Sequence, residues 1–259
     1  PPVARNFVKA LESPHGLCPL ADRPNAFVLS RMGYVLHESD PKMFPVETFY
    51  LYGWSGKLSF DERKNEAEKL YQALKKLTGK ITLIGHSHGG NVIFNLAKIV
   101  EKHNDKDFKI NKLILLATPV QEVYVNFANS PVFEEIISLY STADSIQVLD
   151  PQGLYKKSKK LNTNGFKVPL FSNRLLPDSP KIKQVRILID KCNPGHMDFI
   201  RPKFLKALPE ILNIVANGPE NQRRFIVNIS RKGKPYLVKL IKRRDGRRVY
   251  VPVNTLGVA

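Results

Sequence analysis

Residues 85–89 read Gly-His-Ser-His-Gly, a spacing that can expose a reactive serine hydroxyl. An apolar run at residues 81–84 precedes them, with the length and residue types of a buried parallel strand. A helical apolar pattern follows, so Ser87 lies at a sharp strand-to-helix turn. At such a turn we expect Gly85 and Gly89 to remove side chains that would collide. The pattern predicts that Ser87 is a nucleophile; the alternative is a structural turn serine.

A serine hydroxyl becomes a good nucleophile only when a base takes its proton and an acid orients that base. Among the six histidines only His196 follows a late strand, in a loop at residues 193–199, and we predict it as the general base. Asp144 lies in the loop after an apolar run that ends near Tyr140, and we predict it as the acid. As a structural alternative, Asp144 caps a turn. Three other aspartates remain open as the acid: Asp150, Asp190 and Asp198.

Strand-like and helix-like segments alternate along the chain, which favours an α/β fold with a doubly wound, mostly parallel sheet. The strands are predicted at residues 47–52, 81–84, 112–117, 134–140 and 185–189, the last of them completing the sheet, and the helices at 27–36, 59–77 and 204–215. A capping box of Ser59 and Glu62 is predicted to start the second helix. Residues 118–134 leave no room for a large helical cap. We expect the Pro- and Lys-rich residues 151–181 to form a loop excursion over the catalytic edge.

Three motifs together resemble the α/β-hydrolase superfamily: Gly-His-Ser-His-Gly-Gly, Ser-Thr-Ala-Asp-Ser-Ile-Gln and Gly-His-Met-Asp-Phe. Within that superfamily they are similar to the bacterial lipase and esterase-like members, over about residues 45 to 216. The resemblance implies hydrolysis of carboxylic esters through an acyl-serine intermediate, with a triad of Ser87, Asp144 and His196. It implies no metal and no organic cofactor. The alternative is a non-catalytic binding or interaction protein that keeps the hydrolase scaffold.

The oxyanion of such a reaction needs two backbone donors. We predict the amide of His88, the residue after the nucleophile, as one of them. The family pattern places the second donor after a hydrophobic strand that ends in His-Gly. The pair His15-Gly16 follows a segment with a helical pattern, so we expect that the strand either lies upstream of Pro1 or is replaced by another element. For the side chains of His86 and His88 we expect packing or solvent exposure, not catalysis.

The chain carries a net charge of +18, and its basic residues concentrate near the C-terminus. We predict an α/β-hydrolase domain at residues 1–217 and, at 218–259, a basic extension of three antiparallel strands whose Phe225, Val227 and Ile229 dock on that domain. The basic clusters of the extension favour contact with an anionic membrane surface, which would bring lipid esters to the site. A solubilising or self-associating appendage is the alternative. Nucleic acid is disfavoured because aromatic residues for base stacking are sparse.

Length and cysteine content set the remaining bounds. A chain of 259 residues accommodates one full α/β domain with a small appendage. Cys18 and Cys192 are far apart and in no metal-like spacing, which indicates no disulfide framework and favours the cytoplasm. The chain begins Pro-Pro without an initiator Met, so export remains open. The oligomeric state, the acyl chain length and the leaving group stay open as well.

Overall fold

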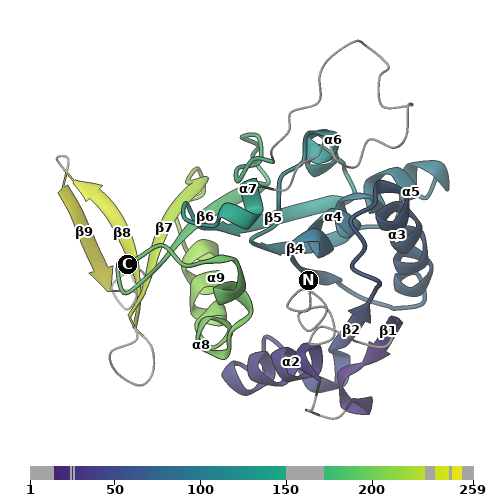
Figure 1. The fold of residues 1–259 in the computed structure, drawn as a ribbon, viewed down its shortest axis with the longest axis horizontal. Helices are drawn as coiled ribbons and strands as arrows, with labels where there is room; N and C mark the ends of the chain where they lie inside the picture. The colour runs from purple at the N-terminus through teal and green to yellow at the C-terminus, as the bar shows by residue number, and fades with distance from the viewer. Residues whose placement is uncertain are drawn as a thin grey trace.

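One seven-stranded sheet forms the centre of the structure, a computed structural model that describes residues 15–23, 25, 27–149, 172–230, 237–244 and 247–252 (Figure 1). Its strands follow one another in chain order: β3 (Thr82–His86), β4 (Ile110–Leu116), β5 (Phe133–Tyr140), β6 (Ile182–Ile189), β7 (Arg224–Ser230), β8 (Leu237–Arg244) and β9 (Arg247–Pro252). Strands β3 to β7 are parallel to one another, whereas the pairs β7–β8 and β8–β9 are antiparallel. The predicted α/β class with a mostly parallel sheet is confirmed.

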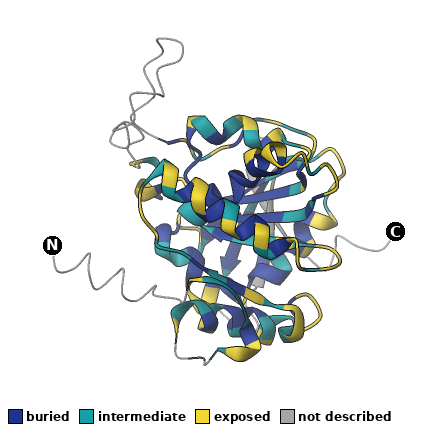
Figure 2. Cartoon of the chain, turned by 90° about the vertical axis from the view of Figure 1, so that its right-hand side faces the viewer, coloured by how far each residue is buried: buried dark blue, intermediate teal, exposed yellow. Residues whose placement is uncertain are grey.

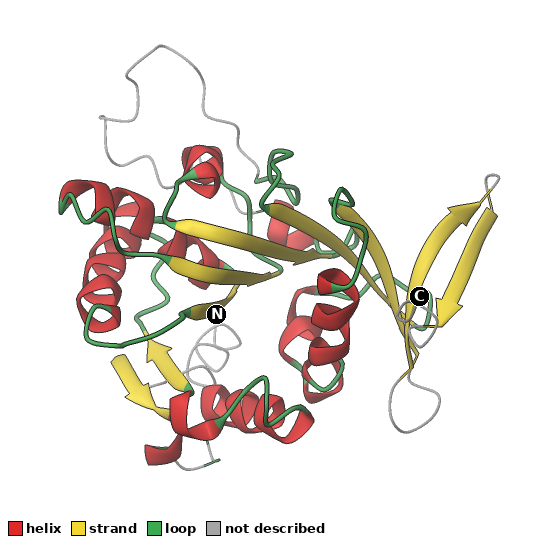
Figure 3. Ribbon diagram, turned by 180° about the vertical axis from the view of Figure 1, so that it is seen from behind, coloured by secondary structure: helices red, strands yellow, loops and turns green. Residues whose placement is uncertain are grey.

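Helices cover both faces of this sheet (Figure 3). On one face lie α3 (Phe60–Leu74), α4 (His88–Phe94) and α5 (Leu96–Lys102), and on the other α2 (Val28–Ser39), α8 (Pro202–Leu205) and α9 (Leu208–Ala216). Strand β4 explains the division, because Leu113 and Leu115 join the first core and Ile114 and Leu116 the second. Figure 2 shows the central strands in the buried colour between the helix layers, and a strand buried on both faces has a nearly continuous apolar sequence, as β4 does. None of the described helices combines the length and apolarity needed to cross a bilayer.

The first strands of the described chain lie outside the main sheet. Strand β1 (Gly16–Pro19) pairs antiparallel with β2 (Tyr50–Gly53), in a separate two-stranded sheet. Residues 15 and 16 therefore meet β2, not β3, and β3 pairs only with β4 among the described strands. The strand predicted at 47–52 begins later than expected, because the 3₁₀ turn η2 (Val46–Thr48) occupies its first residues. A second 3₁₀ turn, η1 (Leu20–Asp22), follows β1.

Short helices connect the strands at the edge where the predicted site residues gather. Between β4 and β5 lie only α6 (Glu122–Val125) and η3 (Asn126–Asn129), so residues 118–134 hold no large cap, as predicted. Helix α7 (Ser145–Val148) follows β5, and η6 (His196–Ile200) follows β6. The expected loop excursion at 151–181 falls mostly outside the described residues, which resume at 172.

The C-terminal strands continue the main sheet. As predicted, Phe225, Val227 and Ile229 are buried, and they belong to the same hydrophobic core as residues of the earlier strands and helices. Strand β8 pairs antiparallel with β7 on one side and with β9 on the other. The expectation that β6 completes the parallel sheet is wrong, because β7 pairs with β6 in parallel along its length. Helices α8 and α9 supply the crossover that a parallel pair requires.

Candidate active site

Ser87 occupies a strained turn between β3 and α4. Its backbone has φ 52° and ψ −131°, a conformation that residues other than glycine rarely adopt. The Ser87 amide donates to the carbonyl of Leu116 on the neighbouring strand at 2.9 Å, which fixes the turn to the sheet. A Cβ added at Gly85 would come within 2.8 Å of the backbone of Gly90, so the strand and the helix approach as closely as a glycine allows.

The second glycine of the turn is not the one expected from the sequence. A Cβ at Gly89 would have no heavy atom within 4 Å, so the prediction that Gly89 relieves a collision is wrong. Gly90 has that role, because a Cβ there would overlap the side chain of Thr118, with its Cγ2 atom only 2.6 Å away. Helix α4 therefore approaches the end of β4 most closely at Gly90, one residue later than the motif suggested.

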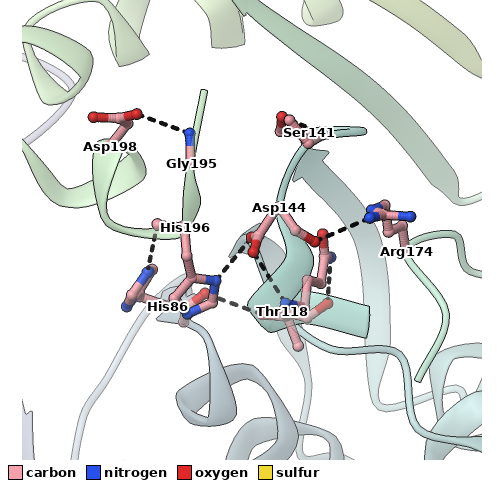
Figure 4. A network of polar contacts seen from close by, with 11 residues as sticks. His86, Thr118, Ser141, Asp144, Arg174, Gly195, His196 and Asp198 are labelled. Atoms are coloured by element: carbon pink, nitrogen blue, oxygen red, sulfur yellow. Dashed lines mark hydrogen bonds and ion pairs between the residues drawn. The ribbon is translucent and has the colours of Figure 1, made fainter. Parts of the chain in front are cut away.

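Asp144 and His196 are brought together by the loops after β5 and β6 (Figure 4). His196 Nδ1 lies 2.8 Å from Asp144 Oδ2, and only 8% of His196 and 1% of Asp144 are exposed. A carboxylate accepts, so Nδ1 carries the proton and Nε2 keeps its lone pair. Asp144 Oδ1 also accepts from the amide of Gln147 at 3.0 Å, so the turn-capping role and the contact with the histidine coexist. Such a pair presents Nε2 as a proton acceptor.

The other aspartates do not contact the His196 ring in the described residues. Asp198 accepts from the Gly195 amide at 2.8 Å and pairs with Arg201 at 2.9 Å (Figure 4). Asp190 ends β6 with φ 49°, and Asp150 lies outside the described residues. The expected contact between Ser87 Oγ and His196 Nε2 is not made as a hydrogen bond within the described part of the chain. Such bonds often tighten only when a substrate is bound.

His86 packs against His196, which the sequence did not suggest. The two ring centroids are 4.9 Å apart, and His86 Nε2 donates to the His196 carbonyl oxygen at 3.3 Å (Figure 4). A carbonyl only accepts, so His86 carries a proton on Nε2. Burial, followed by the proximity of His196, lowers the pKa of His86 from 6.5 to about 4. His86 is therefore neutral near pH 7 and holds the backbone of the His196 loop.

His88 contacts a buried arginine. Its Nδ1 accepts from Arg63 Nη1 at 2.8 Å, and the Asn91 amide nitrogen approaches the same atom at 3.3 Å. Arg63 comes from the first turn of α3 and is 0% exposed. The His88 ring is half-buried and packs in a polar network with Arg63 and Asn91.

An apolar hollow of about 360 Å³ adjoins the His196 loop. Helix α2 lines one side with Val28 and Met32, and Met197, next to His196 in the chain, belongs to the other side. Its volume lies within the range of small-molecule sites. No three His, Cys, Asp or Glu side chains of the described residues are grouped as metal ligands.

Comparisons with known proteins identify no family for this chain. The chain matches no protein-family model, no curated protein and no solved structure.

Proposed function

We propose that this chain is a serine hydrolase that cleaves carboxylic esters, with Ser87, Asp144 and His196 as its triad. The observation that carries the proposal is the 2.8 Å contact between His196 Nδ1 and Asp144, near a serine held at φ 52°. A buried Asp–His pair leaves Nε2 as the proton acceptor, and a strained serine exposes its hydroxyl. The lipase and esterase-like motifs of the sequence support the same reaction.

The proposed reaction has two stages, acylation of Ser87 and hydrolysis of the acyl-serine by water. Ser87 Oγ attacks the ester carbonyl carbon while His196 Nε2 takes its proton, and the carbonyl π electrons move to the oxygen. The His88 amide donates to that oxyanion. When the intermediate collapses, the bond to the leaving alcohol breaks and His196 returns the proton to it. Water, deprotonated by His196 Nε2, then attacks the acyl-serine carbonyl. When this second intermediate collapses, the bond to Ser87 Oγ breaks, His196 returns the proton to Oγ, and the carboxylic acid is released.

The apolar hollow beside Met197 is our candidate for the acyl chain. Its wall begins one residue from the base, and its lining is mainly aliphatic. Burial of an acyl chain there would stabilise binding by about 0.8 kcal/mol for each CH₂ removed from water. Substitution of Val28 by Trp should therefore raise KM for hexanoyl esters more than for acetyl esters.

A fluorophosphonate probe tests the proposal directly. It should label Ser87 in the wild-type protein and leave Ser87→Ala unlabelled, as seen by mass spectrometry of the modified peptide. Asp198→Asn is the matched control, because Asp198 lies two residues from His196 without contacting its ring, and labelling should persist. A folded wild-type protein that neither labels nor hydrolyses p-nitrophenyl esters would favour a binding protein on the same scaffold.

A further inference from the structure

Arg186 lies in β6 beside the end of β5. The strand register pairs it with Tyr140, the last residue of β5. Its half-buried side chain extends beyond the strand end, where Nη2 donates to Thr142 Oγ1 at 3.0 Å and to Asn193 Oδ1 at 2.9 Å. The Thr142 hydroxyl itself donates to Asn193 Oδ1 at 2.8 Å. These three side chains form a closed triangle of hydrogen bonds, which we call the loop clamp.

The donors and acceptors of the loop clamp are mutually consistent. A hydroxyl has one proton to donate and lone pairs with which to accept, so Thr142 can donate to Asn193 while it accepts from Arg186. An amide oxygen has two lone pairs, which match the two donors that reach Asn193 Oδ1. Each of the three hydrogen bonds has its own proton and its own lone pair, so all three can exist together.

The loop clamp joins the two loops that carry the acid and the base of the proposed triad. Thr142 precedes Asp144 by two residues in the loop after β5. Asn193 precedes His196 by three residues in the loop after β6. The same two loops also meet inside the protein, where His196 Nδ1 lies 2.8 Å from Asp144 Oδ2. A buried contact and an exposed clamp therefore connect the acid loop to the base loop.

A tight turn after β6 returns the base loop toward Arg186. The two residues at the centre of this turn, Asp190 and Lys191, have φ 49° and 69°. Across them the backbones of Ile189 and Cys192 exchange hydrogen bonds of 2.8 and 2.9 Å. Positive φ at both central residues is typical of a two-residue turn of type I′. The turn reverses the chain, and the residue that follows it can therefore meet a side chain of β6.

Contacts at both ends hold the segment that connects this turn to η6. Residues 193–195 have no regular secondary structure. At the far end, His86 Nε2 donates to the His196 carbonyl oxygen at 3.3 Å. At the near end, Asn193 belongs to the loop clamp. Loss of the near contact should let the segment move relative to the acid loop, and the His196 ring with it.

We propose that Arg186 is a positioning residue, which keeps the base loop at the separation from the acid loop that the contact between His196 and Asp144 requires. For its effect on catalysis, the proposal rests on the proposed function. Arg186 acts through Thr142 and Asn193 and not on the substrate. Without the clamp the loops should sample separations at which the Nδ1 proton leaves the carboxylate, and Nε2 would then no longer be a fixed proton acceptor.

Loss of the loop clamp can be followed at the proton that the clamp protects. Arg186→Met removes both donors, and Thr142→Val removes the hydroxyl at nearly constant volume. The measurement is the exchange with water of the His196 Nδ1 proton, observed at its far-downfield ¹H signal in protein labelled with ¹⁵N-histidine. We expect this exchange to accelerate about 5- to 30-fold in Arg186→Met, the effect of two hydrogen bonds on a local opening equilibrium, and by less in Thr142→Val.

Two further variants separate the clamp from a general effect of losing an arginine. A single nitrogen of Arg186 makes both loop contacts, and a lysine ammonium has enough protons for both, so Arg186→Lys should recover part of the protection. Arg224→Met is the matched control, because Arg224 lies on the neighbouring strand β7 and pairs at 3.0 Å with Asp178, outside both loops. The Nδ1 proton of this control should exchange as it does in the wild-type protein.

Turnover should follow the same order as proton exchange. With p-nitrophenyl acetate we expect kcat to fall about 5- to 30-fold in Arg186→Met at nearly constant KM, because the base is displaced while the contacts with substrate are retained. Arg186→Lys should lie between this variant and the wild-type protein, and Arg224→Met should equal the wild type. Circular dichroism reports whether each variant is folded.

The outcomes distinguish this inference from the proposed function. An active wild-type protein, with the exchange rate and kcat both unchanged in Arg186→Met, would overturn the inference and leave the hydrolase intact. Equal losses in Arg186→Met and Arg224→Met would overturn it too, because they would follow from the loss of any arginine of the sheet. A wild-type protein without labelling or turnover, whose Nδ1 proton still exchanges faster in Arg186→Met, would remove the hydrolase and keep the clamp.

Discussion

Two histidine pairs lie on either side of Ser87, and the partners of the two histidines carry opposite charges. His196 donates from Nδ1 to the carboxylate of Asp144, whereas His88 accepts at Nδ1 from the guanidinium of Arg63. Both Nδ1 contacts measure 2.8 Å, so the geometry at this atom is alike. The consequence at Nε2 is opposite: His196 has a lone pair there and His88 has a proton. The partner of Nδ1 determines whether a neutral imidazole acts as a base or as a donor.

Loss of the carboxylate should have the largest effect. In Asp144→Asn the amide can present its NH₂ to His196 Nδ1, which would turn the base into the tautomer of His88. We expect kcat for p-nitrophenyl acetate to fall about 10³- to 10⁴-fold. Asp198→Asn should stay within about threefold of wild type. Comparable losses in the two variants would mean that Asp144 is not the residue that orients the base.

The third histidine should make stability depend on pH. The folded pKa of His86 is about 4 against 6.5 for the free side chain, so the unfolded chain binds a proton first as pH falls. Its contribution is fully present above pH 6.5 and is lost between pH 6.5 and 4, up to about 3 kcal/mol in the free energy of unfolding. His86→Gln keeps a donor for the His196 carbonyl and cannot titrate. Urea unfolding of the variant should show a shallower decline in this window; an unchanged slope would assign the loss to other groups.

The two glycines after Ser87 should respond differently to the same substitution. Gly90→Ala places a Cβ against Thr118 and should cost about 1 to 3 kcal/mol of unfolding free energy. Gly89→Ala has open space and should change stability by less than about 1 kcal/mol. Chemical denaturation of both variants measures the difference. Equal costs would contradict the close approach of α4 to β4.

Substitutions in the basic hairpin, formed by β8 and β9, should have the smallest effect, and it should concern binding to anionic surfaces. The register pairs Arg243 with Arg248 and Arg244 with Arg247, which places four arginines at one end of the β8–β9 pair. We propose that this end meets lipid headgroups, at about 1 kcal/mol for each basic residue. Sedimentation with anionic vesicles at low salt should weaken in a double variant, Arg243→Gln with Arg244→Gln.

The control for the hairpin replaces two exposed lysines that lie far from the hairpin in the sequence. A double variant of Lys57→Gln and Lys64→Gln removes the same charge and should sediment as the wild-type protein does. Binding that is indifferent to salt, or equal on neutral vesicles, would contradict the membrane contact. An equal loss of binding in the control variant would mean that the net charge of the protein, and not the hairpin, determines vesicle binding.

The sequence predicted the Asp144–His196 side of the site better than the Arg63–His88 side. Ser87, Asp144 and His196 each follow an apolar run, and parallel strands bring their ends to one edge. Arg63 carries no such signal in a helix with many charges. One clue was present: Arg63 follows Phe60 by three residues and precedes Ala67 by four, so it lies on the apolar stripe.

The C-terminal strands show a different limit of prediction. Alternation in β7 suggested an antiparallel ribbon, and the turn signals in the sequence at residues 232–235 and 245–246 supported that interpretation. The helical segment at 204–215 between β6 and β7 indicated a parallel crossover, a signal that outweighs local alternation. Asn228, on the other face of β7, is 5% exposed and accepts from the Lys191 amide at 2.6 Å, so that strand is covered on both faces.

The tautomers of the two histidines test the account most directly. In protein labelled with ¹⁵N-histidine, long-range ¹H–¹⁵N correlation spectra at pH 7.5 distinguish protonated from unprotonated ring nitrogens, and His88→Gln and Asp144→Asn assign the signals. We predict a protonated Nδ1 for His196 and a protonated Nε2 for His88. The same tautomer in both rings would contradict the division between a ring that accepts a proton at Nε2 and a ring that donates there.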